Sequence, residues 1–159
     1  MSGIEAELHP TPTGCRAAFV IAGAFDNLVI PGRETPTRRD ELWRTTCCEI
    51  FWQPKADTSY REINLSPSTC WAAYDFADYR AKRQDAALDR IVVWSERAED
   101  SLTLKAEIEG IFKLPASIGL STVIEESDGR MQYWALAFPE GPPDFHRASS
   151  RRLHVAGRL

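Results

Sequence analysis

The sequence predicts an all-β protein, folded as an antiparallel sandwich or barrel with at most one short helix. Apolar and polar residues alternate in about ten short segments, which is the pattern of half-buried strands. Turn-forming runs such as Pro31-Gly32, Ser127-Asp128-Gly129 and Glu140-Gly141-Pro142-Pro143 separate most of these segments. Many short strands with turns between them favour a sandwich or barrel over alternating strands and helices.

The clearest strand covers residues 101–109, where Leu102, Leu104, Ala106 and Ile108 alternate with polar residues. Residues 60–66 alternate in the same way around Ile63 and Leu65. In chain order, strands are predicted over residues 16–22, 28–30, 47–53, 60–66, 71–76, 90–94, 101–109, 117–125, 131–138 and 152–155. Residues 79–88 are the one plausible helix, and the polar stretch 32–41 is predicted to be an exposed loop.

Length and charge set the class of protein. The 159 residues are 43% hydrophobic and 26% charged, which predicts one globular domain over residues 1–159. The 19 basic and 23 acidic residues give a net charge of -4, which disfavours nucleic acid as a partner. No apolar run has the roughly 18 residues of a membrane span, so no membrane partner is expected. The first residues show no basic and apolar leader, which predicts a cytoplasmic protein.

The four cysteines are Cys15, Cys47, Cys48 and Cys70, with no C-x-x-C pair. Neighbouring residues of a strand point to opposite faces, so Cys47 and Cys48 are poor partners for each other. The sequence therefore predicts reduced, buried thiols. The alternative is a structural disulfide between Cys15 and Cys70.

Common catalytic and cofactor motifs are missing from the sequence, including G-x-S-x-G, the P-loop, G-x-G-x-x-G and H-E-x-x-H. Three scattered histidines, His9, His146 and His154, are too few for a zinc site. For haem, only Met131 with His146 or His154 offers a Met/His pair. We therefore predict neither a metal nor a cofactor.

The segment 39–80 carries the candidate site. Glu49 lies inside the apolar run 48–52, and a carboxylate there must be paired, hydrogen-bonded or facing a cleft. The next strand offers Glu62 and Asn64 on one face, with Trp43 and Trp71 beside the two strands. Aromatic rings beside carboxylate and amide groups suit sugars, because the ring stacks and the hydroxyls take hydrogen bonds. In the alternative, the tryptophans fill the core, and Glu49 is an anchor paired with Arg39 or Arg61.

These residues also carry a family resemblance. The motifs that carry it are Leu42-Trp43, Thr46-Cys47, Glu49, the run Tyr60-x-Glu62-x-Asn64-Leu65-Ser66-Pro67-Ser68, Trp71-x-Ala73-Tyr74, Tyr79-Arg80, Tyr133-Trp134-Ala135-Leu136-Ala137 and Pro143-Asp144-Phe145-His146. Together they resemble the bacterial DOMON-like domains, which are related to family 9 carbohydrate-binding modules. The resemblance covers roughly residues 19–155. It implies an antiparallel β-sandwich of jelly-roll type that binds a small ligand, commonly a sugar. The family's Trp six positions before a strand Glu corresponds to Trp43, which would stack on the sugar, and Glu49, which would bond its hydroxyls.

We therefore predict a non-catalytic domain that binds a small molecule, a carbohydrate or glycan fragment, with its oligomeric state left open. The predicted ligand-binding residues are Trp43 as stacking platform, Glu49, Glu62 and Asn64 as hydrogen-bond partners, Trp71 as second wall and His146 at the rim. One alternative is a glycoside-active enzyme, because Glu49 and Glu62 supply the two carboxylates that such chemistry needs. The other is a haem-binding redox domain.

Overall fold

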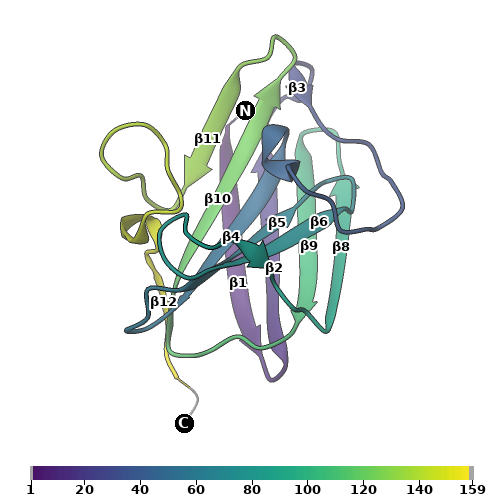
Figure 1. Cartoon of the computed structure of the whole chain (residues 1–159). Helices are drawn as coiled ribbons and strands as arrows, with labels where there is room; N and C mark the ends of the chain where they lie inside the picture. Colours follow the sequence, from purple (N-terminus) through teal and green to yellow (C-terminus); the bar gives the residue numbers. More distant parts are fainter. Residues whose placement is uncertain (1, 158–159) are drawn as a thin grey trace.

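Two antiparallel β-sheets pack face to face in the computed structural model, which describes residues 2–157 (Figure 1). The first sheet, sheet A, has the order β1-β2-β9-β8. Its strands are β1 (Gly3–Thr11), β2 (Gly14–Ala22), β9 (Ser101–Glu109) and β8 (Arg90–Arg97). The prediction of an all-β antiparallel sandwich is confirmed.

The second sheet, sheet B, has the order β11-β10-β4-β5-β6-β7, and β3 and β12 also pair with β10. Its strands are β3 (Leu28–Val29), β4 (Cys47–Pro54), β5 (Tyr60–Leu65), β6 (Trp71–Phe76), β7 (Gln84–Asp85), β10 (Ala116–Glu126), β11 (Met131–Ala135) and β12 (Leu153–Val155). Two short 3-10 turns, η1 (Leu42–Arg44) and η2 (Ala148–Ser150), complete the fold. The long strand β10 is central, because it pairs with β4 on one side and with β11 and β12 on the other.

The main core lies between the two sheets. Alternation aims Phe19 and Leu104 of sheet A at Ile50 and Ile63 of sheet B, and none of these side chains is exposed to solvent. Apolar burial of this kind is the dominant stabilising contribution to folding. The inner face of sheet B is therefore used entirely for packing.

The outer face of sheet B is also largely covered, by a second apolar cluster. Cys47 and Phe51 of β4, Tyr60 of β5 and Tyr74 of β6 pack there with Phe145 from the segment that precedes η2. Sheet B thus lies between sheet A and a layer made by the loop before β4 and the chain from β11 to β12. This is why β4 is buried over six consecutive residues.

The chain from β11 to β12 forms the C-terminal layer, and Arg151 fixes this layer to sheet B. Its guanidinium lies 4.4 Å from the ring centre of Tyr60, donates to the carbonyl oxygen of His146 at 2.9 Å and donates to Gln53 Oε1 at 3.2 Å. The side chain is almost completely buried. These contacts fix the segment that carries His146 over the outer face of sheet B.

The prediction of a helix over residues 79–88 is wrong. The chain there makes a turn, with Ala77 N–H donating to Ala81 O, and then forms the short strand β7. Arg80 and Lys82 have φ of 50° and 52°, in the left-handed region that an α-helix excludes. The structure also adds the edge strand β1, whose Ile4, Ala6 and Leu8 pack on the main core.

The cysteines follow the two-core arrangement. Cys47 lies in the outer cluster and its neighbour Cys48 in the main core, as alternation requires. Cys15 belongs to the main core and Cys70 to the outer cluster, so sheet B separates them. All four are buried free thiols, and the alternative Cys15–Cys70 disulfide is incompatible with this placement.

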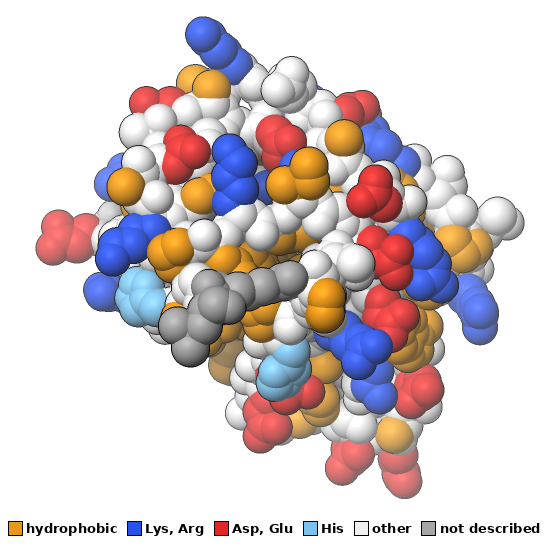
Figure 2. All heavy atoms as spheres, turned by 90° about the horizontal axis from the view of Figure 1, so that it is seen from below, with side chains coloured by type: hydrophobic (Ala, Val, Ile, Leu, Met, Phe, Trp, Pro, Cys, Tyr) orange, Lys and Arg blue, Asp and Glu red, His pale blue; other side chains and the backbone are white. Residues whose placement is uncertain are grey.

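The surface carries both signs of charge. In Figure 2, basic and acidic side chains are interspersed over the face seen from below, without a continuous patch of either sign. Within residues 2–157, no helix is long and apolar enough to cross a membrane. The same residues contain no group of three or more His, Cys, Asp and Glu side chains placed to hold a metal ion.

The close approach of β2 and β9 predicts a large effect of one methyl group. A Cβ added at Gly14 would lie 1.9 Å from the carbonyl oxygen of Ile108. We expect Gly14→Ala to lower the free energy of unfolding in urea by about 1–3 kcal/mol, because strands β2 and β9 must separate locally. Gly3→Ala is the control, since its Cβ has no neighbour within 4 Å. Equal stability of the two variants would contradict this packing.

Candidate functional site

A pocket of about 740 Å3 opens on the outer face of sheet B, where the covering layer is incomplete. It is bounded by β4, β5 and β6 below, by η1 and β11 at the sides, and by the segment from Pro143 to His146. Its lining residues are Trp43, Arg44, Glu49, Phe51, Glu62, Tyr74, Phe76, Arg80, Arg83, Val123, Met131, Tyr133, Pro143, Asp144, Phe145 and His146.

Two carboxyl groups lie on the floor of the pocket. Alternation points Glu49 of β4 and Glu62 of β5 to the outer face, and each is only 5% exposed. Ser121 Oγ donates to Glu49 Oε2 at 2.8 Å, and Asn64 Nδ2 donates to Glu62 Oε1 at 2.9 Å. Ser121 of the neighbouring strand β10 and Asn64 of β5 therefore hold the two carboxyl groups in fixed positions.

Burial changes the ionisation of both groups. It raises the pKa of Glu49 from 4.5 to about 8, and the nearby Glu62 adds to this effect. Burial also raises the pKa of Glu62, although the hydrogen bond from Asn64 opposes it. At neutral pH the Glu49 carboxyl is thus mainly protonated and can both donate and accept hydrogen bonds.

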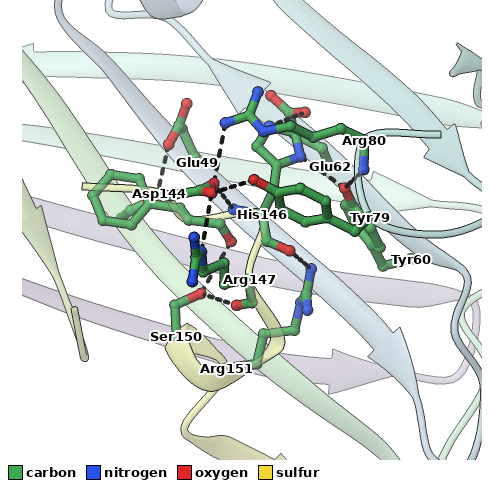
Figure 3. A network of polar contacts seen from close by, with 12 residues as sticks. Glu49, Tyr60, Glu62, Tyr79, Arg80, Asp144, His146, Arg147, Ser150 and Arg151 are labelled. Atoms are coloured by element: carbon green, nitrogen blue, oxygen red, sulfur yellow. Dashed lines mark hydrogen bonds and ion pairs between the residues drawn. The ribbon is translucent and has the colours of Figure 1, made fainter. Parts of the chain in front are cut away.

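His146 connects the floor to the rim. Its Nδ1 lies 2.8 Å from Tyr60 Oη, and its Nε2 lies 3.6 Å from Glu62 Oε2 (Figure 3). Burial, with a further contribution from Arg80, lowers the pKa of His146 to about 4. The imidazole is therefore neutral at physiological pH.

Asp144 organises the polar rim of the pocket. It accepts hydrogen bonds from Tyr79 Oη at 2.5 Å, from Arg80 Nη2 at 3.0 Å and from the backbone of His146 at 3.2 Å (Figure 3). Burial tends to raise the pKa of Asp144, but the hydrogen bonds from Tyr79 and Arg80 outweigh burial and lower it. An ionised Asp144 thus ties the turn after β6 to the C-terminal layer.

Two half-exposed aromatic rings border the pocket. Trp43 is 44% exposed on η1, and Tyr133 is 42% exposed on β11. The buried side chain of Leu42 anchors η1 in the outer cluster, and Arg44 lies 5.2 Å from the ring centre of Trp43. Exposed rings at a pocket border provide flat apolar faces for a ligand.

The structure brings together four of the six predicted site residues, since Trp43, Glu49, Glu62 and His146 all line the pocket. Asn64 lies on the same face of β5 as Glu62, is fully buried and positions Glu62 through its hydrogen bond. Trp71 does not form a second wall. It is paired with Leu65 and faces the main core, on the opposite side of sheet B from the pocket.

Sequence reasoning missed Tyr133, which takes the place at the pocket border that we expected of a second tryptophan. The sequence pattern that could have identified Tyr133 is strand alternation. Tyr133 pairs with Val123 of β10 and faces outward, whereas the next residue, Trp134, faces the main core. Arg80, Arg83 and Asp144 were also missed as pocket residues. They reach the pocket from a turn and a long connection, where no periodicity predicts side-chain direction.

Two alternatives from the sequence are disfavoured by the contacts. Arg61 pairs with Asp75 at 2.7 Å and Arg39 with Glu34 at 2.6 Å, so neither anchors Glu49. For the Met131–His146 pair, a haem iron would need a free imidazole nitrogen, but both ring nitrogens of His146 face protein partners within 4 Å.

Comparison with known proteins adds one structural relative. No protein-family model matches the chain, and no curated protein sequence matches it. The crystal structure of a candidate carbohydrate-binding protein from Bacteroides uniformis is similar, with a TM-score of 0.60 over 92% of this chain and 75% of that chain. The two sequences are 14% identical, so the similarity shows a shared fold.

The raised pKa of Glu49 predicts a pH-dependent stability. Folded protein keeps a proton that the unfolded chain releases above pH 4.5, so the stability from this group is complete below pH 4.5 and falls toward pH 8. Relative to Glu49→Gln, we expect wild type to lose about 2–4 kcal/mol of unfolding free energy between pH 5 and 8.

The measurement is urea unfolding of wild type and Glu49→Gln across this pH range. Glu96→Gln, an exposed carboxylate change on β8, is the control and should follow the wild-type curve. A constant difference between wild type and Glu49→Gln at all pH values would show that Glu49 is ionised in the folded protein.

Proposed function

We propose that this protein is a non-catalytic carbohydrate-binding domain whose ligand occupies the pocket on the outer face of sheet B. One observation carries the proposal: half-exposed Trp43 and Tyr133 border a pocket whose floor holds the buried carboxyls of Glu49 and Glu62. This combination matches a sugar, which has apolar C–H faces and a ring of hydroxyls. The fold shared with a candidate carbohydrate-binding protein supports it.

Four lining residues have assigned parts in this binding. Trp43 stacks on a sugar face, and Tyr133 supplies a second ring at the border. The protonated carboxyl of Glu49 donates to one hydroxyl and Glu62 accepts from another. Asn64 and Ser121 act through these carboxyls by holding them. A single half-open site of this kind binds at millimolar to micromolar concentration, roughly 4–8 kcal/mol. Membership of the DOMON-like domains is part of this proposal.

The stacking role of Trp43 predicts a loss of affinity without a loss of fold. We expect Trp43→Ala to weaken sugar binding about tenfold or more, because it removes a flat ring worth roughly 1.5–3 kcal/mol when covered. Its melting temperature should stay within about 2 °C of wild type, since the ring is half exposed. Binding is measured by calorimetry with ligands chosen from a glycan array.

Leu136→Ala is the matched control, because Leu136 is 47% exposed and outside the pocket lining. It should bind like wild type. If Trp43→Ala binds like wild type as well, the sugar does not stack on Trp43.

A glycoside-active enzyme is a second candidate, favoured by one observation. Glu49 and Glu62 are two buried carboxyls on one pocket floor, and burial keeps Glu49 protonated as a general acid requires. Within the described residues, however, Glu62 is hydrogen-bonded to Asn64 and close to His146, which suits a fixed acceptor for a ligand.

A hydrolysis assay separates the two candidates. As a binding domain, the protein should release no nitrophenol from a panel of nitrophenyl glycosides between pH 5 and 8. Release that is abolished in both Glu49→Gln and Glu62→Gln would establish catalysis instead.

A further inference from the structure

Three guanidinium groups line the pocket, and they differ in their partners. Arg80 is engaged by Asp144 at 3.0 Å, and Arg44 by Glu41 at 2.8 Å. Arg83 makes no ion pair or side-chain hydrogen bond with any residue from 2 to 157, and it is exposed at the pocket border. Its five donors are therefore available to a ligand.

An aromatic ring holds Arg83 in place. Its guanidinium lies 4.7 Å from the ring centre of Tyr74, and Tyr74 donates to Asp40 Oδ1 at 2.6 Å. A guanidinium over an aromatic ring keeps its edge free for planar, bidentate contacts with an anion. The position of Arg83 is thus set without the use of its hydrogen-bonding edge.

The charges that face the pocket favour an anion. Arg44, Arg80 and Arg83 contribute three positive charges, and Asp144 is the one rim carboxylate in the lining. Burial keeps Glu49 mainly protonated at neutral pH, and His146 is neutral. Glu41 and Asp144 offset the charges of Arg44 and Arg80. The guanidinium of Arg83 therefore leaves a local positive charge at the pocket border, without an ion-pair partner among residues 2–157, although the whole chain has a net charge of -4.

We infer that the pocket selects a sugar ring that carries a carboxylate, as hexuronic acids do, and that Arg83 is the residue that contacts this carboxylate. The inference rests on the proposed carbohydrate binding and adds the class of sugar. The planar carboxylate matches the fork of a guanidinium, which forms two parallel hydrogen bonds with it. The hydroxyls of the same ring remain for the floor carboxyls of Glu49 and Glu62.

Matched pairs of ligands test the inference. Calorimetry at pH 7 and low salt compares glucuronate, galacturonate and mannuronate with glucose, galactose and mannose. We expect at least one uronate to bind about tenfold more tightly than its neutral partner, the scale of one charge-assisted hydrogen bond. Arg83→Gln should abolish this preference, so that the uronate and its neutral partner bind to this variant with affinities equal within about twofold.

Lys82→Gln is the matched control, because it removes the same charge from the adjacent residue, which lies outside the pocket lining. It should keep the preference for the uronate. The change in net charge alone cannot then explain the effect of Arg83→Gln, since both variants have the same net charge.

The other outcomes distinguish the inference from the function on which it rests. Equal binding of a uronate and its neutral partner, or a preference that survives in Arg83→Gln, overturns the inference and leaves the carbohydrate site intact. If glucose 6-phosphate binds more tightly than every uronate, the preferred anionic group is a phosphate and not a carboxylate, and the inference is overturned as well. Binding of none of these sugars, acidic or neutral, counts against both proposals.

Discussion

Sheet B has to be covered on both faces, and the rest of the structure follows from this requirement. Its inner face packs on sheet A, and its outer face carries Phe51, Tyr60 and Tyr74, which water would otherwise surround. The loop before β4 and the C-terminal layer supply the cover. They leave a gap over Glu49 and Glu62, and this gap is the pocket. The site is therefore the part of a second hydrophobic core that the chain leaves open.

The gap also explains the chemistry of its floor. A carboxyl group that is surrounded by packed side chains loses hydration, and its neutral form becomes favoured. Glu49 is in this situation, with Ser121 as its hydrogen-bond donor. The rim differs, because Asp144 collects enough donors to stay ionised. One pocket thus combines a protonated Glu49 on its floor with an ionised Asp144 at its border.

Much of this arrangement could be predicted from the sequence, and the exceptions have physical reasons. Alternation along β4 and β5 gave the placement of Glu49 and Glu62, because strand neighbours alternate faces. The same rule places Trp71 on the inner face, but the apolar character of both faces of sheet B hid which side it occupies. The helix predicted over residues 79–88 does not form, because Arg80 and Lys82 adopt left-handed backbone conformations in a turn. Tyr133 reaches the pocket through the pairing of β10 with β11, and local sequence cannot give such non-local contacts.

The adjacent cysteines of β4 provide two independent reporters of how this molecule opens. Cys47 is buried in the outer cluster, whereas Cys48 is buried in the main core between the two sheets. A thiol reagent reaches Cys47 when the outer cluster opens and reaches Cys48 when the two sheets separate. The labelling rates of two neighbouring residues therefore measure the local opening of the outer face of sheet B separately from the global unfolding of the sandwich.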